Sequence, residues 1–263
     1  MTFENLEFAI ENGLARITLN RPEGANTIGV GMARDLLDAA RRCDGNPEVR
    51  AVLLTGKGRF FSGGGDVQSF AAAEDDAAGL LNRITGPLHA AIASFARMNA
   101  PLVTAINGTA AGAGFSLAIS GDIVVAAESA KLTLAYTRIG MSADGGASHM
   151  LPQIVGLTRA KELMLLNPLL TATEAEQLGL VTLVVPDADL AAKANEIATA
   201  LACGPTRAFG EVKRLLVASH GNTLEQQLAL EARSMATLAD GSQDAREGFA
   251  AFVQKRAAKF TGR

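Results

Sequence analysis

Hydrophobic and polar residues alternate in two runs near the start of the chain, on either side of Asn12 and Gly13. Alternation at every second position is typical of half-buried strands, and Asn-Gly is a frequent hairpin turn. Residues 6–22 are therefore predicted to form a β-hairpin. In residues 31–43 the apolar side chains are spaced three and four positions apart, which predicts a helix that ends at Gly45.

Five later apolar runs are short and do not alternate, which is typical of strands buried on both faces. They cover residues 50–56, 101–108, 122–128, 131–136 and 180–186. Helices are predicted over residues 80–99 and 109–122, and a glycine-rich loop that enters a helix is predicted over 56–70. Strands and helices thus alternate along most of the chain.

The last third of the chain has a different pattern. Thr171 and Glu174 have the spacing of a capping box, and Gly179 marks the end of that helix. From Leu190 onward only helical spacing is found. The pattern predicts an α/β fold, with a core over residues 1–195 and a helical region over 196–263.

Composition limits the possible functions of the 263-residue chain. It is 48% hydrophobic and 19% charged, with a net charge of −3, so a nucleic-acid partner is not expected. Cys43 and Cys203 lie far apart, with no metal-binding spacing, which favours a reducing cytoplasm. We expect no metal, no signal peptide and no membrane span.

Glycine-rich stretches follow several predicted strands but match no nucleotide fingerprint. The stretch with Gly112 and Gly114 lacks the third glycine of a dinucleotide motif, and Gly58 stands where a P-loop needs Ser or Thr. Each stretch opens into a helix, whose first N–H groups can hold a developing oxyanion. The alternative interpretation is tight packing of strand against helix.

An acid among small residues, Asp144, is either a helix cap or a catalytic carboxylate. Ser116, Asp144 and His149 or His220 follow each other in the order of some hydrolases. However, the strand over 101–108 ends well before Ser116, so a sharp nucleophile turn is not expected. His89, in the predicted helix, is more often a structural than a catalytic type of residue.

Four stretches in register carry a family resemblance. They are FFSGGGD (60–66), APLVTAINGTAAGAGFSLAISGDIVVAA (100–127), IGMSADGGASHMLPQIVG (139–156) and TATEAEQLGLV (171–181). Their order and spacing resemble the crotonase family, the enoyl-CoA hydratase/isomerase superfamily. The resemblance implies a spiral of ββα units with a helical C-terminal trimerisation region, assembled as a homotrimer or a hexamer.

The resemblance also implies the substrate, an acyl-CoA thioester, and no cofactor apart from the coenzyme A of the substrate. The thioester oxygen would be held by the backbone N–H groups of Gly65 and Ala113. Arg21 would replace a basic residue that the family commonly has just before Asn26. By position, the resemblance assigns substrate binding to Arg21, Asn26, Gly63, Gly64, Asp66, Leu88, Gly112, Gly114, Phe115, Ser116, Tyr136, Phe252 and Lys255.

This sequence departs from the family's hydratases at two positions. Hydratases use two glutamates to activate water, and Ser116 and Tyr136 occupy those positions here. Asp144 instead matches the acid of isomerases that shift a double bond. The resemblance therefore implies a Δ3 to Δ2 enoyl-CoA isomerase with Asp144 as acid and base.

Several alternatives stay open within the same family. Aromatic acyl-CoA dehalogenases carry a nucleophilic aspartate at the position of Asp144 and a histidine at that of His89, but their tryptophans are replaced by Leu88 and Tyr136. The ring-oxepin isomerase of phenylacetate breakdown also uses an aspartate like Asp144. An enoyl-CoA hydratase and a non-catalytic acyl-CoA binder complete the alternatives.

Overall fold

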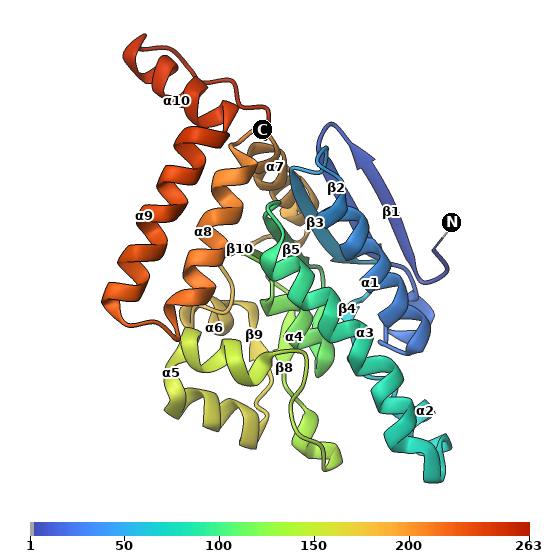
Figure 1. The fold of residues 1–263 in the computed structure, drawn as a ribbon. Helices are drawn as coiled ribbons and strands as arrows, with labels where there is room; N and C mark the ends of the chain where they lie inside the picture. The colour runs from blue at the N-terminus through green and yellow to red at the C-terminus, as the bar shows by residue number, and fades with distance from the viewer. Residues whose placement is uncertain (1–2) are drawn as a thin grey trace.

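The computed structural model describes residues 3–263, and two β-sheets form its centre (Figure 1). Within these residues the larger sheet has six strands in the order β1-β2-β3-β5-β7-β10. The first pair is antiparallel, as the Asn-Gly turn predicts, and the other pairs are parallel. The strands are β1 (Leu6–Glu11), β2 (Leu14–Leu19), β3 (Ala51–Gly56), β5 (Leu102–Ile106), β7 (Ile123–Ala127) and β10 (Leu183–Val185).

The smaller sheet is made of short strands in the order β4-β6-β8-β9. They are β4 (Phe60–Ser62), β6 (Thr109–Ala111), β8 (Lys131–Thr133) and β9 (Leu170–Thr171). β4, β6 and β8 are parallel, and each follows a strand of the larger sheet after a turn of a few residues. The chain thus passes from the larger to the smaller sheet three times in succession, which confirms the predicted α/β spiral.

Helices cover both sheets and continue beyond them. They are α1 (Val30–Gly45), α2 (Val67–Ala72), α3 (Ala77–Arg97), α4 (Ala113–Ile119), α5 (Ala147–Leu166), α6 (Ala172–Gln177), α7 (Leu190–Ala202), α8 (Thr206–Ser219), α9 (Leu224–Gly241) and α10 (Gln243–Val253). α1 packs along α3, and α7 packs against β3, β5 and β7. α6 begins with the capping box predicted at Thr171 and Glu174.

Two predicted segments differ from the structure. The expected loop over 56–70 contains β4, and the expected helix over 109–122 begins with β6, so α4 is only seven residues long. β4 and β6 pair with each other in parallel. A strand of three residues is too short to show alternation, and the pairing that stabilises it comes from distant residues.

The C-terminal helices extend away from the sheets, and α8, α9 and α10 follow each other along one side of Figure 1. The expected boundary at residue 195 falls inside α7, which packs on the larger sheet. α8 is tied to the core by a buried ion pair, because the Nζ of Lys213 lies 2.7 Å from the Oδ2 of Asp122. Over residues 3–263, no helix is long and apolar enough to cross a membrane.

Candidate active site

Three strand ends of the smaller sheet meet at one edge. Because β4, β6 and β8 are neighbours and parallel, the residues that follow them lie side by side. These residues are the glycines 63–65 after β4, Gly112 and Ala113 after β6, and Ala135 and Tyr136 after β8. Ligand sites in open α/β sheets commonly lie at such carboxyl ends.

The backbone N–H groups of Gly65 and Ala113 lie at this edge, and neither has an acceptor among the described residues. Ala113 is the first residue of α4, so its N–H is one of the amides that a helix leaves unpaired. Both residues line the same cavity. Two fixed, unused donors in one cavity can stabilise a negative oxygen.

The loops that carry these amides approach closely at Gly64. Its φ is +90°, a left-handed conformation that favours glycine. A Cβ added there would lie 2.5 Å from the carbonyl oxygen of Ala111 and 3.3 Å from the nitrogen of Ala113. The absence of a side chain at Gly64 therefore allows the two donors to converge.

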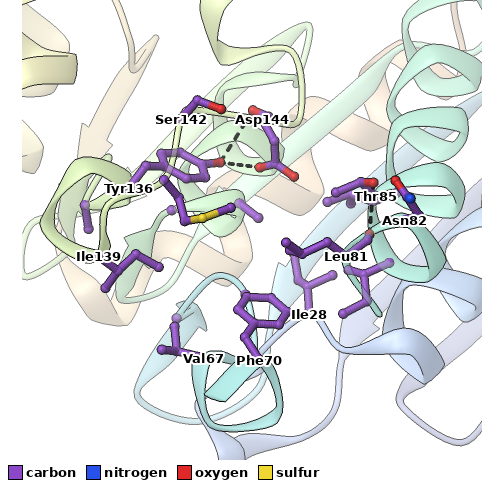
Figure 2. A pocket seen from close by; sticks show the side chains of 18 residues that line it. Ile28, Val67, Phe70, Leu81, Asn82, Thr85, Tyr136, Ile139, Ser142 and Asp144 are labelled. Carbon is purple, nitrogen blue, oxygen red and sulfur yellow. Dashed lines mark hydrogen bonds between the residues drawn. The ribbon is translucent and has the colours of Figure 1, made fainter. Parts of the chain in front are cut away.

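The cavity in front of these amides has a volume of about 360 Å³, within the usual range for a small-molecule site. Figure 2 shows apolar side chains around most of it, with Asp144 and Tyr136 facing them from the other side. We call it the front cavity. Its lining consists of Ile28, Gly63, Gly65, Val67, Phe70, Leu81, Asn82, Ile84, Thr85, Leu88, Gly112, Ala113, Ala135, Tyr136, Ile139, Met141, Ser142 and Asp144.

Asp144 is the carboxylate that lines the front cavity in the described part of the chain. Its side chain is 23% exposed, and its Oδ1 accepts a hydrogen bond of 2.6 Å from the hydroxyl of Tyr136 (Figure 2). Burial, together with the nearby charge of Asp144, raises the pKa of Tyr136. The phenol therefore keeps its proton at neutral pH and acts as a fixed donor that orients the carboxylate.

The turn that presents Asp144 is supported from below by Ser116. The Ser116 side chain is fully buried, and its hydroxyl donates a 2.9 Å hydrogen bond to the backbone oxygen of Asp144. Gly145 follows with a φ of +60°, and a Cβ there would lie 2.8 Å from the Cβ of Ser116. Ser116 thus positions the acid through the backbone and does not face the front cavity.

His89 contacts the same acid from another direction. Its Nε2 lies 3.4 Å from the Oδ2 of Asp144 and accepts a 3.1 Å hydrogen bond from the N–H of Gly145. The pattern of residues within each segment did not predict this contact, because α3 and the turn after η3 (Tyr136–Ile139) are distant in the chain; the resemblance to dehalogenases alone had named the two residues together. His89 was expected to have a structural role, but its contacts with Asp144 and Gly145 place it beside the candidate acid.

His89 lines a second cavity, which we call the rear cavity. It has a volume of about 560 Å³ and lies between α3, α5 and α8, with His89, Gly145, His149, Lys213 and His220 among its lining residues. The rings of His149 and His220 are 6.1 Å apart. Neither ring lies beside Ser116, so the structure does not assemble a hydrolase triad.

Two of the predicted binding residues, Asn26 and Phe115, are buried and contact other parts of the protein rather than the front cavity. The amide of Asn26 is fully buried, and it bonds to the carbonyl oxygens of Lys57, Phe60 and Phe61. Its Oδ1 also accepts a hydrogen bond from the backbone N–H of Arg21. Asn26 thereby fixes the loop that carries Arg21. Phe115 is fully buried in the core and does not line the front cavity.

The predicted binding residues Gly63, Gly112 and Tyr136 line the front cavity, whereas Asp66, Phe252 and Lys255 do not. Asp66 caps α2 by accepting from the N–H and the hydroxyl of Ser69. Leu88 lines the front cavity from α3, as expected for a wall residue. Phe252 is 86% exposed, and both it and Lys255 lie at the end of α10, away from the α2 side of Figure 1. Their contact with a neighbouring subunit's coenzyme A stays a prediction.

Much of the apolar wall was not predicted. Leu81, Ile84 and Thr85 line the front cavity from α3 beside the predicted Leu88. Their spacing of three and four residues is the signal that one face of a helix gives. Ile28, Phe70 and Met141 come from loops or a short helix, where no periodicity marks them.

Comparison with known proteins identifies the class of protein. Residues 9–263 match the family model described as enoyl-CoA hydratase/isomerase. A solved enoyl-CoA hydratase from a Polaromonas species superposes with a TM-score of 0.91 at 33% identity, covering 97% of this chain and 99% of that one. The chain belongs to the enoyl-CoA hydratase/isomerase (crotonase) family.

Two curated relatives are similar over nearly their full lengths. A Rhodobacter capsulatus protein named probable enoyl-CoA hydratase is 41% identical, with 100% of both chains covered. The 1,2-epoxyphenylacetyl-CoA isomerase of Escherichia coli is 38% identical, with 97% of both chains covered. These names span both a hydratase and an isomerase, so the family alone leaves the reaction type open.

Proposed function

We propose that this protein is an enoyl-CoA isomerase that shifts a double bond from the Δ3 to the Δ2 position, with Asp144 as acid and base. The observation that carries the proposal is the chemistry of the front cavity. Among the described lining residues, one carboxylate faces two free backbone amides across an apolar space. The hydratase glutamate positions hold Ser116, which is fully buried, and Tyr136, which stays protonated.

The proposed reaction needs one group that both removes and returns a proton. Asp144 takes a proton from C2 of a 3-enoyl-CoA, and the electrons of that C–H bond form a dienolate. The negative thioester oxygen of the dienolate is stabilised by the N–H groups of Gly65 and Ala113. Asp144 then returns the proton to C4, which leaves the double bond between C2 and C3. No water is consumed, so a second carboxylate is not required.

A second candidate is isomerisation of an aromatic epoxide on a CoA thioester. It is favoured by the 38% identity to the 1,2-epoxyphenylacetyl-CoA isomerase of Escherichia coli. The walls formed by Ile28, Phe70 and Leu88 are apolar and suit a ring as well as an alkyl chain. Both candidates use an isomerase acid in place of a hydratase pair.

We also propose that the chain assembles with copies of itself, as a homotrimer or as paired trimers. Large apolar side chains are exposed on the C-terminal helices, including Met235 on α9 at 74% and Phe252 and Val253 on α10 at 86% and 80%. Clusters of this kind commonly mark protein interfaces. A mass in solution equal to one chain would contradict the assembly.

The test of function is the ultraviolet absorbance of the purified protein with two substrates, 3-hexenoyl-CoA and 2-hexenoyl-CoA. Conjugation of the double bond with the thioester adds an absorption band, and hydration removes it. We expect the band to appear with the 3-enoyl substrate and to persist with the 2-enoyl substrate. Loss of the band from the 2-enoyl substrate would instead indicate a hydratase. No change with either substrate would favour the aromatic epoxide, which is tested next.

A further inference from the structure

The two oxygens of the Asp144 carboxylate face different surroundings. Oδ1 accepts from Tyr136, whose hydroxyl is next to the fully buried Ser116, at 2.9 Å. Oδ2 lies 3.4 Å from the Nε2 of His89. Asp144 lines the front cavity, whereas His89 lines the rear cavity. The contact between Oδ2 and Nε2 therefore joins the two cavities.

The hydrogen bond from the N–H of Gly145 determines the tautomer of the neutral His89 imidazole. Because Nε2 accepts the N–H of Gly145, it carries no proton, and the neutral ring holds its proton on Nδ1. The one lone pair of Nε2 is directed at the N–H of Gly145, so Nε2 can act as a base toward Asp144, 3.4 Å away, once that hydrogen bond opens. The His89 side chain is 48% exposed and belongs to the rear cavity, so the ring reaches solvent without crossing the front cavity.

We propose that His89 exchanges the proton of Asp144 with solvent in the rear cavity while the substrate occupies the front cavity; this rests on the isomerase function proposed above. After Asp144 has taken the proton from C2, the hydrogen bond from Gly145 to Nε2 opens, the O–H bond of Asp144 breaks and an Nε2–H bond forms, giving an imidazolium. Nδ1 then releases its proton to water. The reverse sequence delivers a solvent proton to Asp144, so the net charge of the pair is unchanged.

The Oδ1 of Asp144 offers no comparable route for proton exchange with solvent. The phenol of Tyr136 is held between Asp144 and the buried Ser116, and burial raises its pKa, so it does not release its own proton at neutral pH. In the front cavity a bound acyl chain displaces solvent from the acid. His89 is the exposed titratable side chain that contacts Asp144 among the described residues.

The experiment is isomerisation of 3-hexenoyl-CoA in D2O, with deuterium at C4 of the product measured by mass spectrometry at low conversion. We expect the wild-type protein to place deuterium at C4. In His89→Gln, the amide oxygen can still accept from Gly145 but cannot carry a proton, so the deuterium fraction falls about tenfold and the substrate proton is retained. His149→Gln, which alters another histidine of the rear cavity, should match the wild type.

Two results would overturn the inference, and both differ from failure of the proposed function. A wild-type product that fully retains the substrate proton excludes exchange without any variant. Equal deuterium fractions in His89→Gln and wild type would show that protons reach Asp144 by another route. A wild-type protein that forms no 2-hexenoyl-CoA would overturn the isomerase proposal itself, and the relay with it.

Discussion

Replacing Asp144 with asparagine is expected to lower kcat for the double-bond shift by about 10³-fold, because the variant has no group that can accept the C2 proton. The amide keeps the shape of the carboxylate, and its oxygen can still accept from the hydroxyl of Tyr136. Binding of a saturated acyl-CoA should therefore be unchanged. A loss in kcat without a change in binding is the signature of a group that acts only in the transition state.

A matched control separates this loss from a general effect of charge. Asp38→Asn makes the same change on the exposed side of α1, far from either cavity lining. Its rate of isomerisation should equal that of the wild type, measured by the same absorbance assay. Wild-type turnover in Asp144→Asn would exclude Asp144 as the base and remove the main support for the proposed mechanism.

Replacing Lys213 with methionine is expected to lower the free energy of unfolding by about 3 kcal/mol, the lower end of the range for breaking a buried ion pair. The Lys213 side chain is 8% exposed, and its Nζ donates to the carbonyl oxygens of Phe95 and Ala100 in addition to contacting Asp122. Methionine has a similar length but removes the donor to these two carbonyl oxygens and the positive charge beside Asp122, whose Oδ2 keeps only the N–H of Leu102 among the described residues. The lower end applies because the Asp122 side chain is 29% exposed.

The pKa shifts of Lys213 and Asp122 show why each charge is stabilised by the presence of the other. Burial lowers the pKa of Lys213 although Asp122 opposes the shift, and burial raises the pKa of Asp122 although Lys213 opposes it. Burial therefore disfavours the charged form of each group, and the opposite charge of the partner offsets part of that cost. The pair keeps α8 attached to the end of α3 more by the penalty of separation than by its own net stability.

Urea unfolding at one fixed protein concentration measures this effect. The control is Lys193→Met, which removes an exposed pair with Glu196, where Nζ and Oε2 are 2.9 Å apart. Such a pair within one helix contributes about 0.5 kcal/mol or less. Equal midpoints for the two variants would contradict the assignment of Lys213 as a buried link between the C-terminal helices and the core.

Regular patterns in the sequence predicted much of the fold. The hairpin around Asn12 and Gly13, the buried strands of the larger sheet and the C-terminal helices each depend on spacing within one segment. In the smaller sheet, β8 lies within the strand predicted over 131–136, but β4 and β6 were not predicted, because they are three residues long and are stabilised by each other. Composition around residues 109–122 resembles a helix, but its first residues pair as a strand.

In the candidate site, too, features within one segment were predicted and contacts between distant segments were not. Asp144 and the glycine-rich loops stood out because small residues surround an acid or follow a strand. The contact of His89 with Asp144 was not predicted, since 55 positions separate them and the contact depends on how α3 packs against the loop before α5. At Asn26 the structure shows a role that the family position did not predict, since its side chain bonds to carbonyl oxygens of the loop; its part in substrate binding stays a prediction.

The order of the three parallel strands has an evolutionary consequence. The loops after β4 and β6 provide main-chain amides, and the chain after β8 provides the acid and its phenol partner. Except for a change to proline, a side-chain substitution leaves the backbone N–H in place. Under the proposed function, substitutions that introduce new acids, bases or water-binding groups at the third strand end would therefore leave the two amides for the thioester oxygen unchanged.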